Sequence, residues 1–162
     1  VISVLYVLEV RGITIRQIPY LKIHLISLSW AVVVVLFPLT NQPRNVDLWL
    51  LSVLFFAHYF YTLAVTIPFD IRDLKHDTQS HKTIPQVIGV RNSQVLSLFL
   101  LLICSIALIG IDFVAPSNVF FYCAILIQMI LVLCMNEKRT DLYCAGLIDG
   151  SIALLGASYF FN

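Results

Sequence analysis

The sequence predicts an all-α fold, a polytopic transmembrane helix bundle. Of its 162 residues, 60% are hydrophobic and 12% are charged, and the mean hydropathy is +0.93. These values lie far from those of a soluble globular domain, in which about a quarter of the residues are charged. Five apolar runs have the length of about 20 residues that a membrane-spanning helix needs. Polar residues or prolines separate the runs, as expected between spanning helices.

The five apolar runs predict five full spans within a single membrane domain, 1–162. Prolines punctuate three of the four breaks, at Pro38 and Pro43, at Pro68 and Pro85, and at Pro116. Proline favours these breaks because it cannot continue the hydrogen-bonding pattern of a helix interior. The predicted spans are 20–39, 46–67, 93–113, 117–135 and 142–161.

A sixth apolar segment, 1–8, is too short to span a membrane. At about 1.5 Å per residue it covers only about half of the ~30 Å hydrocarbon core. No initiator methionine or basic stretch precedes it, so it does not resemble a signal peptide. We expect it to be the end of a spanning helix, which would make the chain the C-terminal part of a longer protein. A short interfacial segment is the alternative.

Basic residues collect in the connections that alternate to one side of the predicted bundle. The connections 9–22, 68–92 and 136–141 together carry nine lysines and arginines, whereas the opposite connections carry only Arg44. The positive-inside rule therefore predicts a multi-pass integral membrane protein, in the inner membrane if bacterial, with 68–92 as a cytoplasmic loop. Basic loops suit anionic lipid or an anionic substrate, and nothing in the sequence indicates nucleic acid.

Three carboxylates lie within eight residues directly after the second span. Asp70, Asp73 and Asp77 have the spacing i, i+3 and i+7, so a continuous helix would turn them to one side, within roughly 60° of each other. Arg72 and Lys75 would then point elsewhere. Three like charges on one face repel, which favours a bound cation. Mg²⁺ is the candidate, since it binds a few carboxylates together with water and phosphate oxygens.

The rest of the 68–92 loop supplies positive charge near the carboxylates. Pro68 can begin a new helical turn after the span ends near Ile67. Lys82 and Arg91 lie within reach of a phosphate that an aspartate-bound metal would hold. A long polar loop in a compact bundle is more often functional than incidental, so we favour a metal and phosphate site. The alternative is a solvated loop whose acids and bases pair.

Asp149 is a second candidate, about two turns inside the last span. An ionisable side chain in a membrane span costs a few kcal/mol unless it faces the protein interior, which marks it as a functional candidate. It lies between Gly146 and Gly150, a spacing of small residues that permits close helix approach. A buried polar group that ties two helices together is an equal alternative.

The 68–92 loop resembles the second aspartate-rich motif of the UbiA superfamily of intramembrane prenyltransferases. The residues that carry this resemblance are Asp70-Ile71-Arg72-Asp73, Asp77, Lys82-Thr83-Ile84-Pro85 and the glycine that follows. Proteins of this superfamily have nine transmembrane helices around a central cavity, and two aspartate-rich motifs hold Mg²⁺ and the diphosphate of a prenyl donor. The resemblance implies that the five full spans are the last five of nine, preceded by the tail of the fourth.

Two features depart from the pattern of that superfamily. The first aspartate-rich motif is absent from the chain, which agrees with the expectation that roughly 110–130 N-terminal residues of a full-length enzyme precede it. Ser80-His81 also occupies the place where the superfamily often has a glycine. A degenerate relative without the first motif is the alternative.

The resemblance implies Mg²⁺-dependent transfer of a prenyl group from a prenyl diphosphate to an aromatic or other lipophilic acceptor. Asp73 and Asp77 would hold Mg²⁺, and Asp70 would bind a second ion or orient metal-bound water. Side chains that would bind residual phosphate charge or substrate are Lys82, Arg91, Arg72, Lys75 and Asp149. Aromatic residues of the preceding span would help to keep the cavity dry, namely Phe55, Phe56, Tyr59, Phe60 and Tyr61. This chain alone, with one motif, is expected to be inactive.

Two other classes of function compete with the enzyme. A non-catalytic membrane scaffold or lipid-binding relative would lack an aspartate-rich motif in the upstream coding sequence. A transporter would bind a transported ion at the charged face, but it would favour discontinuous helices or repeats near the middle of the membrane, and neither is evident in the sequence.

Overall fold

The structure is a computed structural model that describes residues 9–10, 13–14, 20–38, 47–75 and 83–161. It is an all-α bundle, as the sequence predicts. The helices are α2 (Leu21–Ala31) with its π-helical continuation η2 (Val32–Leu36), α3 (Leu48–Asp73), α4 (Ile84–Gly110), α5 (Val119–Leu133), and η4 (Tyr143–Ile148) leading into α6 (Asp149–Ser158) and η5 (Tyr159–Phe161). The described part of the N-terminal region adds a two-residue antiparallel pairing of β1 (Glu9–Val10) with β2 (Ile13–Thr14).

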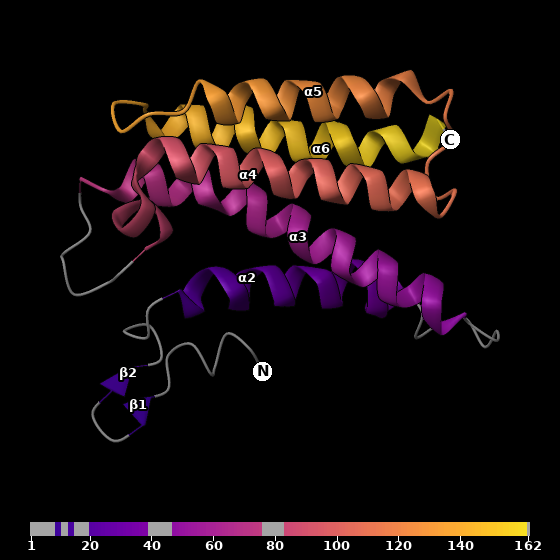
Figure 1. Cartoon of the computed structure of the whole chain (residues 1–162), viewed down its shortest axis with the longest axis horizontal. Coiled ribbons are helices and arrows are strands. Elements are labelled where there is room, and N and C mark those ends of the chain that lie inside the picture. Colours follow the sequence, from indigo (N-terminus) through magenta and orange to yellow (C-terminus); the bar gives the residue numbers. More distant parts are fainter. Residues whose placement is uncertain (1–8, 11–12, 15–19, 39–46, 76–82, 162) are drawn as a thin grey trace.

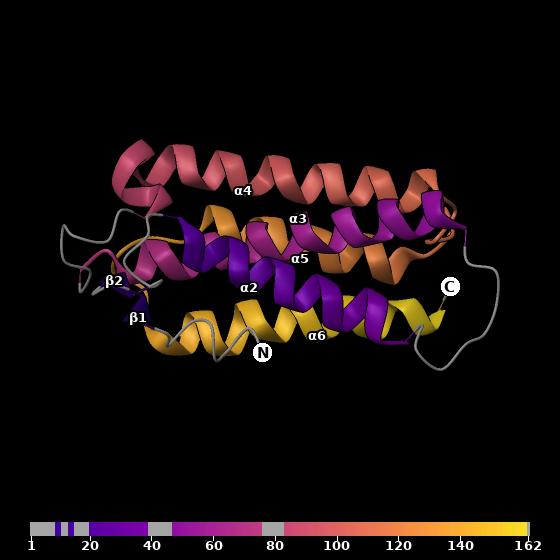
Figure 2. The same cartoon turned by 90° about the horizontal axis from the view of Figure 1, so that it is seen from below.

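The helices lie side by side and alternate in direction. α5 runs beside both α4 and α6, α3 packs against α4, and α2 packs against α3 (Figure 1). Figure 2 gives the same arrangement from below. One end of the bundle, on the left in both views, holds the beginnings of α2, α4 and η4 and the ends of α3 and α5. The connections predicted to lie on one side of the bundle therefore do gather at one end, which we call the motif end.

Three helices are long and apolar enough to cross a membrane: Leu48–Asp73, Ile84–Gly110 and Tyr143–Phe161. The two other predicted spans are the shorter apolar helices Leu21–Leu36 and Val119–Leu133. The second of these has 15 residues, or about 22 Å at 1.5 Å per residue, because Asn118 caps its beginning and it ends at Leu133. The described residues thus contain three helices of full spanning length rather than five.

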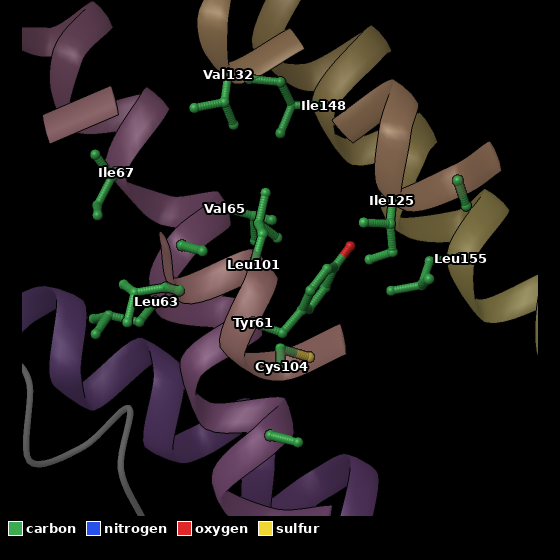
Figure 3. Packing of buried hydrophobic residues seen from close by; sticks show 14 of the residues in the cluster. Tyr61, Leu63, Val65, Ile67, Leu101, Cys104, Ile125, Val132, Ile148 and Leu155 are labelled. Atoms are coloured by element: carbon green, nitrogen blue, oxygen red, sulfur yellow. The ribbon is translucent and has the colours of Figure 1, made fainter. Parts of the chain in front are cut away.

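The core lies between α3 and α4 and extends from them through α5 to α6. Figure 3 shows side chains from these helices converging, among them Ile67, Leu101 and Ile148, all of which have no measurable exposure. Large apolar side chains also cover the outside of the bundle, including Trp30 and Phe99. Apolar groups on both the inside and the outside are typical of a bundle that lipid surrounds.

A buried polar cluster joins three of the helices. The Tyr61 hydroxyl on α3 donates a hydrogen bond to Gln128 Oε1 on α5 at 3.1 Å, and the Ser151 hydroxyl on α6 contacts the same oxygen at 2.6 Å. In Figure 3 the Tyr61 hydroxyl points away from its own helix. Because buried polar groups must be satisfied by partners, this cluster favours one relative register of the three helices.

Helix α3 continues past Pro68, where the sequence predicts its end near Ile67. Proline lacks the N–H that would bond the carbonyl of Ala64 four residues earlier. In the structure, the Ser97 hydroxyl on α4 donates to this carbonyl at 2.7 Å, and both Ala64 and Ser97 have no measurable exposure. The neighbouring helix therefore satisfies the group that proline leaves free, and α3 extends to Asp73.

The predicted loop 68–92 is consequently much shorter. Residues 68–73 belong to α3, and α4 begins at Ile84, where Gln86 Oε1 accepts a hydrogen bond from the N–H of Thr83 at 3.1 Å. Gly89 then kinks α4, with φ 79° and ψ 163°. Residues with a side chain rarely adopt this backbone conformation, so only glycine fits here without strain.

We expect Gly89→Ala to lower the stability of the protein by about 1 kcal/mol, because nothing crowds the site and the cost is backbone strain alone. Thermal unfolding in detergent, followed by circular dichroism, measures the loss. Gly156→Ala is the matched control, since this position in α6 is equally open but has an ordinary helical backbone. Alanine there should be neutral or stabilising by up to about 1 kcal/mol. Equal effects of the two substitutions would show that the backbone conformation at Gly89 imposes no strain on alanine.

Candidate functional site

The structure describes only some of the charged residues singled out from the sequence. Asp70 and Asp73 lie in the last turn of α3, and residues 74–75 form a turn after it. Asp77 and Lys82 lie outside the described residues. The continuous helix that would align all three carboxylates therefore extends through Asp73 and no further in the described chain.

Asp70 faces α2. Its side chain is 8% exposed, and its carboxylate forms an ion pair with Lys22 Nζ at 3.5 Å. Lys22 lies in the first turn of α2 and is partly exposed. In the sequence, Lys22 is one of the nine basic residues on this side. Its position at the entry of an apolar helix at the same end is the signal that could have singled it out.

Arg72 connects Asp73 to a second carboxylate from a distant part of the chain. Its Nε donates to Asp73 Oδ1 at 2.7 Å, and its Nη1 lies 3.3 Å from Asp141 Oδ1, just before η4. The guanidinium also lies 5.5 Å from the ring centre of Phe69. The prediction that Arg72 points away from the aspartates is wrong, because a long, flexible side chain can fold back onto its neighbour. Asp141 was not predicted as part of the site.

The other three described candidates do not join this cluster. Lys75, Arg91 and Asp149 are exposed, and none has an ion pair with another described residue. Asp149 is the first residue of α6, and neither glycine beside it packs against another helix: Gly150 has open space, and Gly146 meets only Leu142 of its own segment. Close helix approach at this glycine pair is therefore not observed.

The cluster at the motif end is electrostatically balanced to within one charge. Two cations, Lys22 and Arg72, meet three carboxylates, Asp70, Asp73 and Asp141, which leaves a formal charge of −1 (2 − 3). Within the described parts of the chain, no three metal-ligating side chains converge on a common point. Both described aspartates of the motif already have basic partners, so the repulsion that suggested a bound cation is relieved within the protein.

Asp73 nevertheless fits Mg²⁺ better than Asp70 does. Carboxylate oxygens are the hard donors that Mg²⁺ prefers, and it takes only one or two of them alongside waters and phosphate oxygens. The Asp73 side chain is 28% exposed, so an ion can reach it, whereas the Asp70 carboxylate is buried against α2. An ion at Asp73 would have to compete with the Arg72 guanidinium.

An apolar groove of about 370 Å³ lies between α2 and α3. Its one close polar pair is His24 Nδ1 with the Tyr59 hydroxyl, 2.6 Å apart. Tyr59 precedes Asp70 by eleven residues. At 100° per residue this is a rotation of about 1,100° about the helix axis, or three full turns plus about 20°, so both residues lie on the same side of α3. The groove is lined by Leu21, His24, Leu25, Leu28, Phe55, Phe56 and Tyr59.

The aromatic residues of α3 thus divide between this groove and the core. Phe55, Phe56 and Tyr59 line the groove, whereas Tyr61 is buried against Gln128. His58, half-buried on the same helix, has its Nδ1 2.8 Å from the carbonyl of Leu54. Sequence alone could not make this division, because all these residues lie in one uninterrupted apolar run.

Comparison with known proteins yields no match: no family model, curated protein or solved structure corresponds to this chain. The resemblance of the motif residues to the UbiA superfamily therefore stands on those residues alone. The features that bear on the function of this chain are the charges at the motif end and the apolar groove near them.

Proposed function

We propose that this chain is the C-terminal part of an Mg²⁺-dependent intramembrane prenyltransferase of the UbiA superfamily. It would transfer a prenyl group from a prenyl diphosphate to an aromatic or other lipophilic acceptor. The observation that carries the proposal is the pairing of an accessible carboxylate, Asp73, with a guanidinium, Arg72, at the end of an apolar helix. These are the two chemical groups that a metal-bound diphosphate requires, located where an apolar chain can extend into the bundle.

The basic residues of the motif end would bind the diphosphate. Arg72 offers a planar fork of donors that matches phosphate oxygens, and Lys22 adds a point charge from α2. Lys75 and Lys82, in the connection between α3 and α4, and Arg91, near the beginning of α4, would contribute further positive charge. Asp73 and Asp77 would hold Mg²⁺, which when bound would neutralise charge on the leaving diphosphate. Asp70, already paired with Lys22, would orient that lysine rather than ligate the ion directly.

The groove between α2 and α3 would receive part of the apolar chain of a substrate. Tyr59 and Asp70 share one side of α3 and are separated by about 16 Å along the helix axis, at 1.5 Å per residue. A prenyl chain that begins at a diphosphate on the motif end therefore has an apolar path toward the aromatic residues. Exclusion of water from this path would protect a reactive allylic cation.

The distribution of basic residues supports a multi-pass membrane protein whose motif end faces the cytoplasm. The described lysines and arginines of α2, α3, α4 and the segment before η4 all lie at this end. Anionic headgroups of the cytoplasmic leaflet would then attract the same basic residues that bind the diphosphate.

The proposal is tested with the full-length protein in membranes. Labelled geranylgeranyl diphosphate is supplied with a panel of aromatic and lipophilic acceptors, and prenylated product is measured with Mg²⁺ or with excess EDTA. We expect product with Mg²⁺ and none with EDTA. Diphosphate release that does not depend on Mg²⁺, or no transfer to any acceptor class, contradicts the proposal.

A non-catalytic lipid-binding relative is the second candidate. The observation that favours it is that both described aspartates of the motif are already paired with basic side chains. The coding sequence upstream of Val1 separates the two candidates. A prenyltransferase requires a second cluster of Asn and Asp residues within about 130 codons, as the resemblance implies, whereas a scaffold has no need of one.

A further inference from the structure

Arg72 is shared between two carboxylates that come from different parts of the chain. Arg72 donates through Nε to Asp73 on its own helix, and its Nη1 lies 3.3 Å from Asp141, 69 residues later in the chain. The Asp141 side chain is almost fully exposed, and Arg72 is its one ion-pair partner among the described residues. The guanidinium is also held against Phe69, 5.5 Å from its ring centre, which favours a fixed orientation.

We propose that Arg72 is an internal counter-ion of Asp73, which a metal ion displaces when it binds the Asp73 carboxylate. Asp141 is then the positioning residue that keeps the displaced guanidinium in the site. This inference rests on the proposed function, because it concerns the same aspartate. It adds to that function that the ion displaces the Arg72 guanidinium and that Asp141 retains the displaced side chain.

The geometry makes the exchange possible without removing Arg72. A guanidinium has five donors in a plane, so Arg72 can give up the bond from Nε and still keep the contact from Nη1 to Asp141. Held there, its remaining donors would be free to bind the oxygens of a diphosphate beside Asp73. Without Asp141, the cation would have Asp73 as its sole described carboxylate partner and would compete more strongly with an incoming metal ion.

The test measures Mn²⁺ binding to the full-length protein in nanodiscs by electron paramagnetic resonance, with no diphosphate present. We expect Arg72→Gln to raise the affinity for Mn²⁺ by about threefold to tenfold, the range for loss of a partly buried ion pair. Lys75→Gln is the matched control, because it removes the same charge from the same end of α3 without touching a described carboxylate. It should raise the affinity less than about twofold, through long-range charge alone.

A second variant addresses Asp141. We expect Asp141→Asn to lower the affinity for Mn²⁺ by about twofold to threefold, and also to weaken binding of inorganic pyrophosphate measured with Mg²⁺ by calorimetry. Glu137→Gln, which removes a carboxylate from the same connection, should change neither quantity. Asp141→Glu, which keeps the charge, should restore both. A merely structural role for Asp141 would move the unfolding temperature and leave the two affinities unchanged.

The outcomes also separate this inference from the function on which it rests. If Asp73→Asn binds as much Mn²⁺ as the wild-type protein, or if the wild type binds none, the metal site and the exchange are both wrong. If Mn²⁺ does bind at Asp73 but Arg72→Gln and Lys75→Gln shift its affinity equally, the metal site stands and the counter-ion exchange is overturned. Arg72→Lys guards against misfolding, since it retains the charge and should give an affinity between those of wild type and Arg72→Gln.

Discussion

We expect Asp73→Asn to reduce Mg²⁺-dependent prenyl transfer by the full-length protein by a factor on the order of 10² or more. Asparagine keeps the shape of the side chain but removes the negative charge that would hold the ion and that now pairs with Arg72 at 2.7 Å. Asp77→Asn should have an effect of the same size. Product formation in membranes containing equal amounts of each folded variant measures the loss.

The control for this prediction lies at the opposite end of the same helix. Asp47 caps α3 by accepting a hydrogen bond from the N–H of Trp49 at 2.9 Å. Asparagine caps helices as well as aspartate does, so Asp47→Asn should leave both stability and activity unchanged. Full activity of Asp73→Asn or of Asp77→Asn would remove the metal role of that residue.

The fold class could be predicted from the sequence because apolar runs of spanning length leave few alternatives. The helix cap at Asn118 follows a similarly local rule: its side chain accepts a hydrogen bond from the N–H of Phe121 at 3.0 Å, as is common for an asparagine directly before a helix. Local patterns of this kind depend on residues within a few positions of one another. Such patterns can therefore be predicted without knowledge of the tertiary structure.

The contacts of the candidate site could not be predicted in the same way. Lys22 pairs with Asp70 across 48 residues, and Arg72 reaches Asp141 across 69. Which basic residue meets which acid depends on how α2, α3 and the segment before η4 come together, and no spacing in the sequence encodes this. The motif and its charges are accordingly evident in the sequence, whereas the helical spacing predicts that the three carboxylates share one metal-facing side.

The end of α3 was misplaced for a related reason. Pro68 is a strong local signal for the end of a helix, yet α3 continues to Asp73 because the Ser97 hydroxyl on α4 satisfies the carbonyl of Ala64 at 2.7 Å. A tertiary contact thus overrides the local rule. It also determines where the aspartates lie, since a helix that stopped near Ile67 would leave Asp70 and Asp73 on a loop.

We therefore expect Ser97→Ala to destabilise the protein by about 2 kcal/mol, because it leaves a buried carbonyl without the donor that proline cannot supply. Unfolding of the purified protein by heat or by SDS in mixed micelles measures the change. Ser105→Ala is the control: this hydroxyl bonds the Leu101 carbonyl within α4 itself at 2.8 Å, so its loss should cost well under about 1 kcal/mol.

A double substitution isolates the cause of the Ser97 effect. Pro68→Ala returns an N–H to α3 that can bond the Ala64 carbonyl directly, so the hydroxyl of Ser97 is no longer needed there. In the Pro68→Ala background, Ser97→Ala should cost less than half of what it costs in the wild type. If the two effects simply add, the serine stabilises the interface by packing alone, and the extension of α3 to Asp73 needs another explanation. Coupling between Pro68 and Ser97 would instead show that a hydroxyl on α4 keeps the motif aspartates of α3 on a helix.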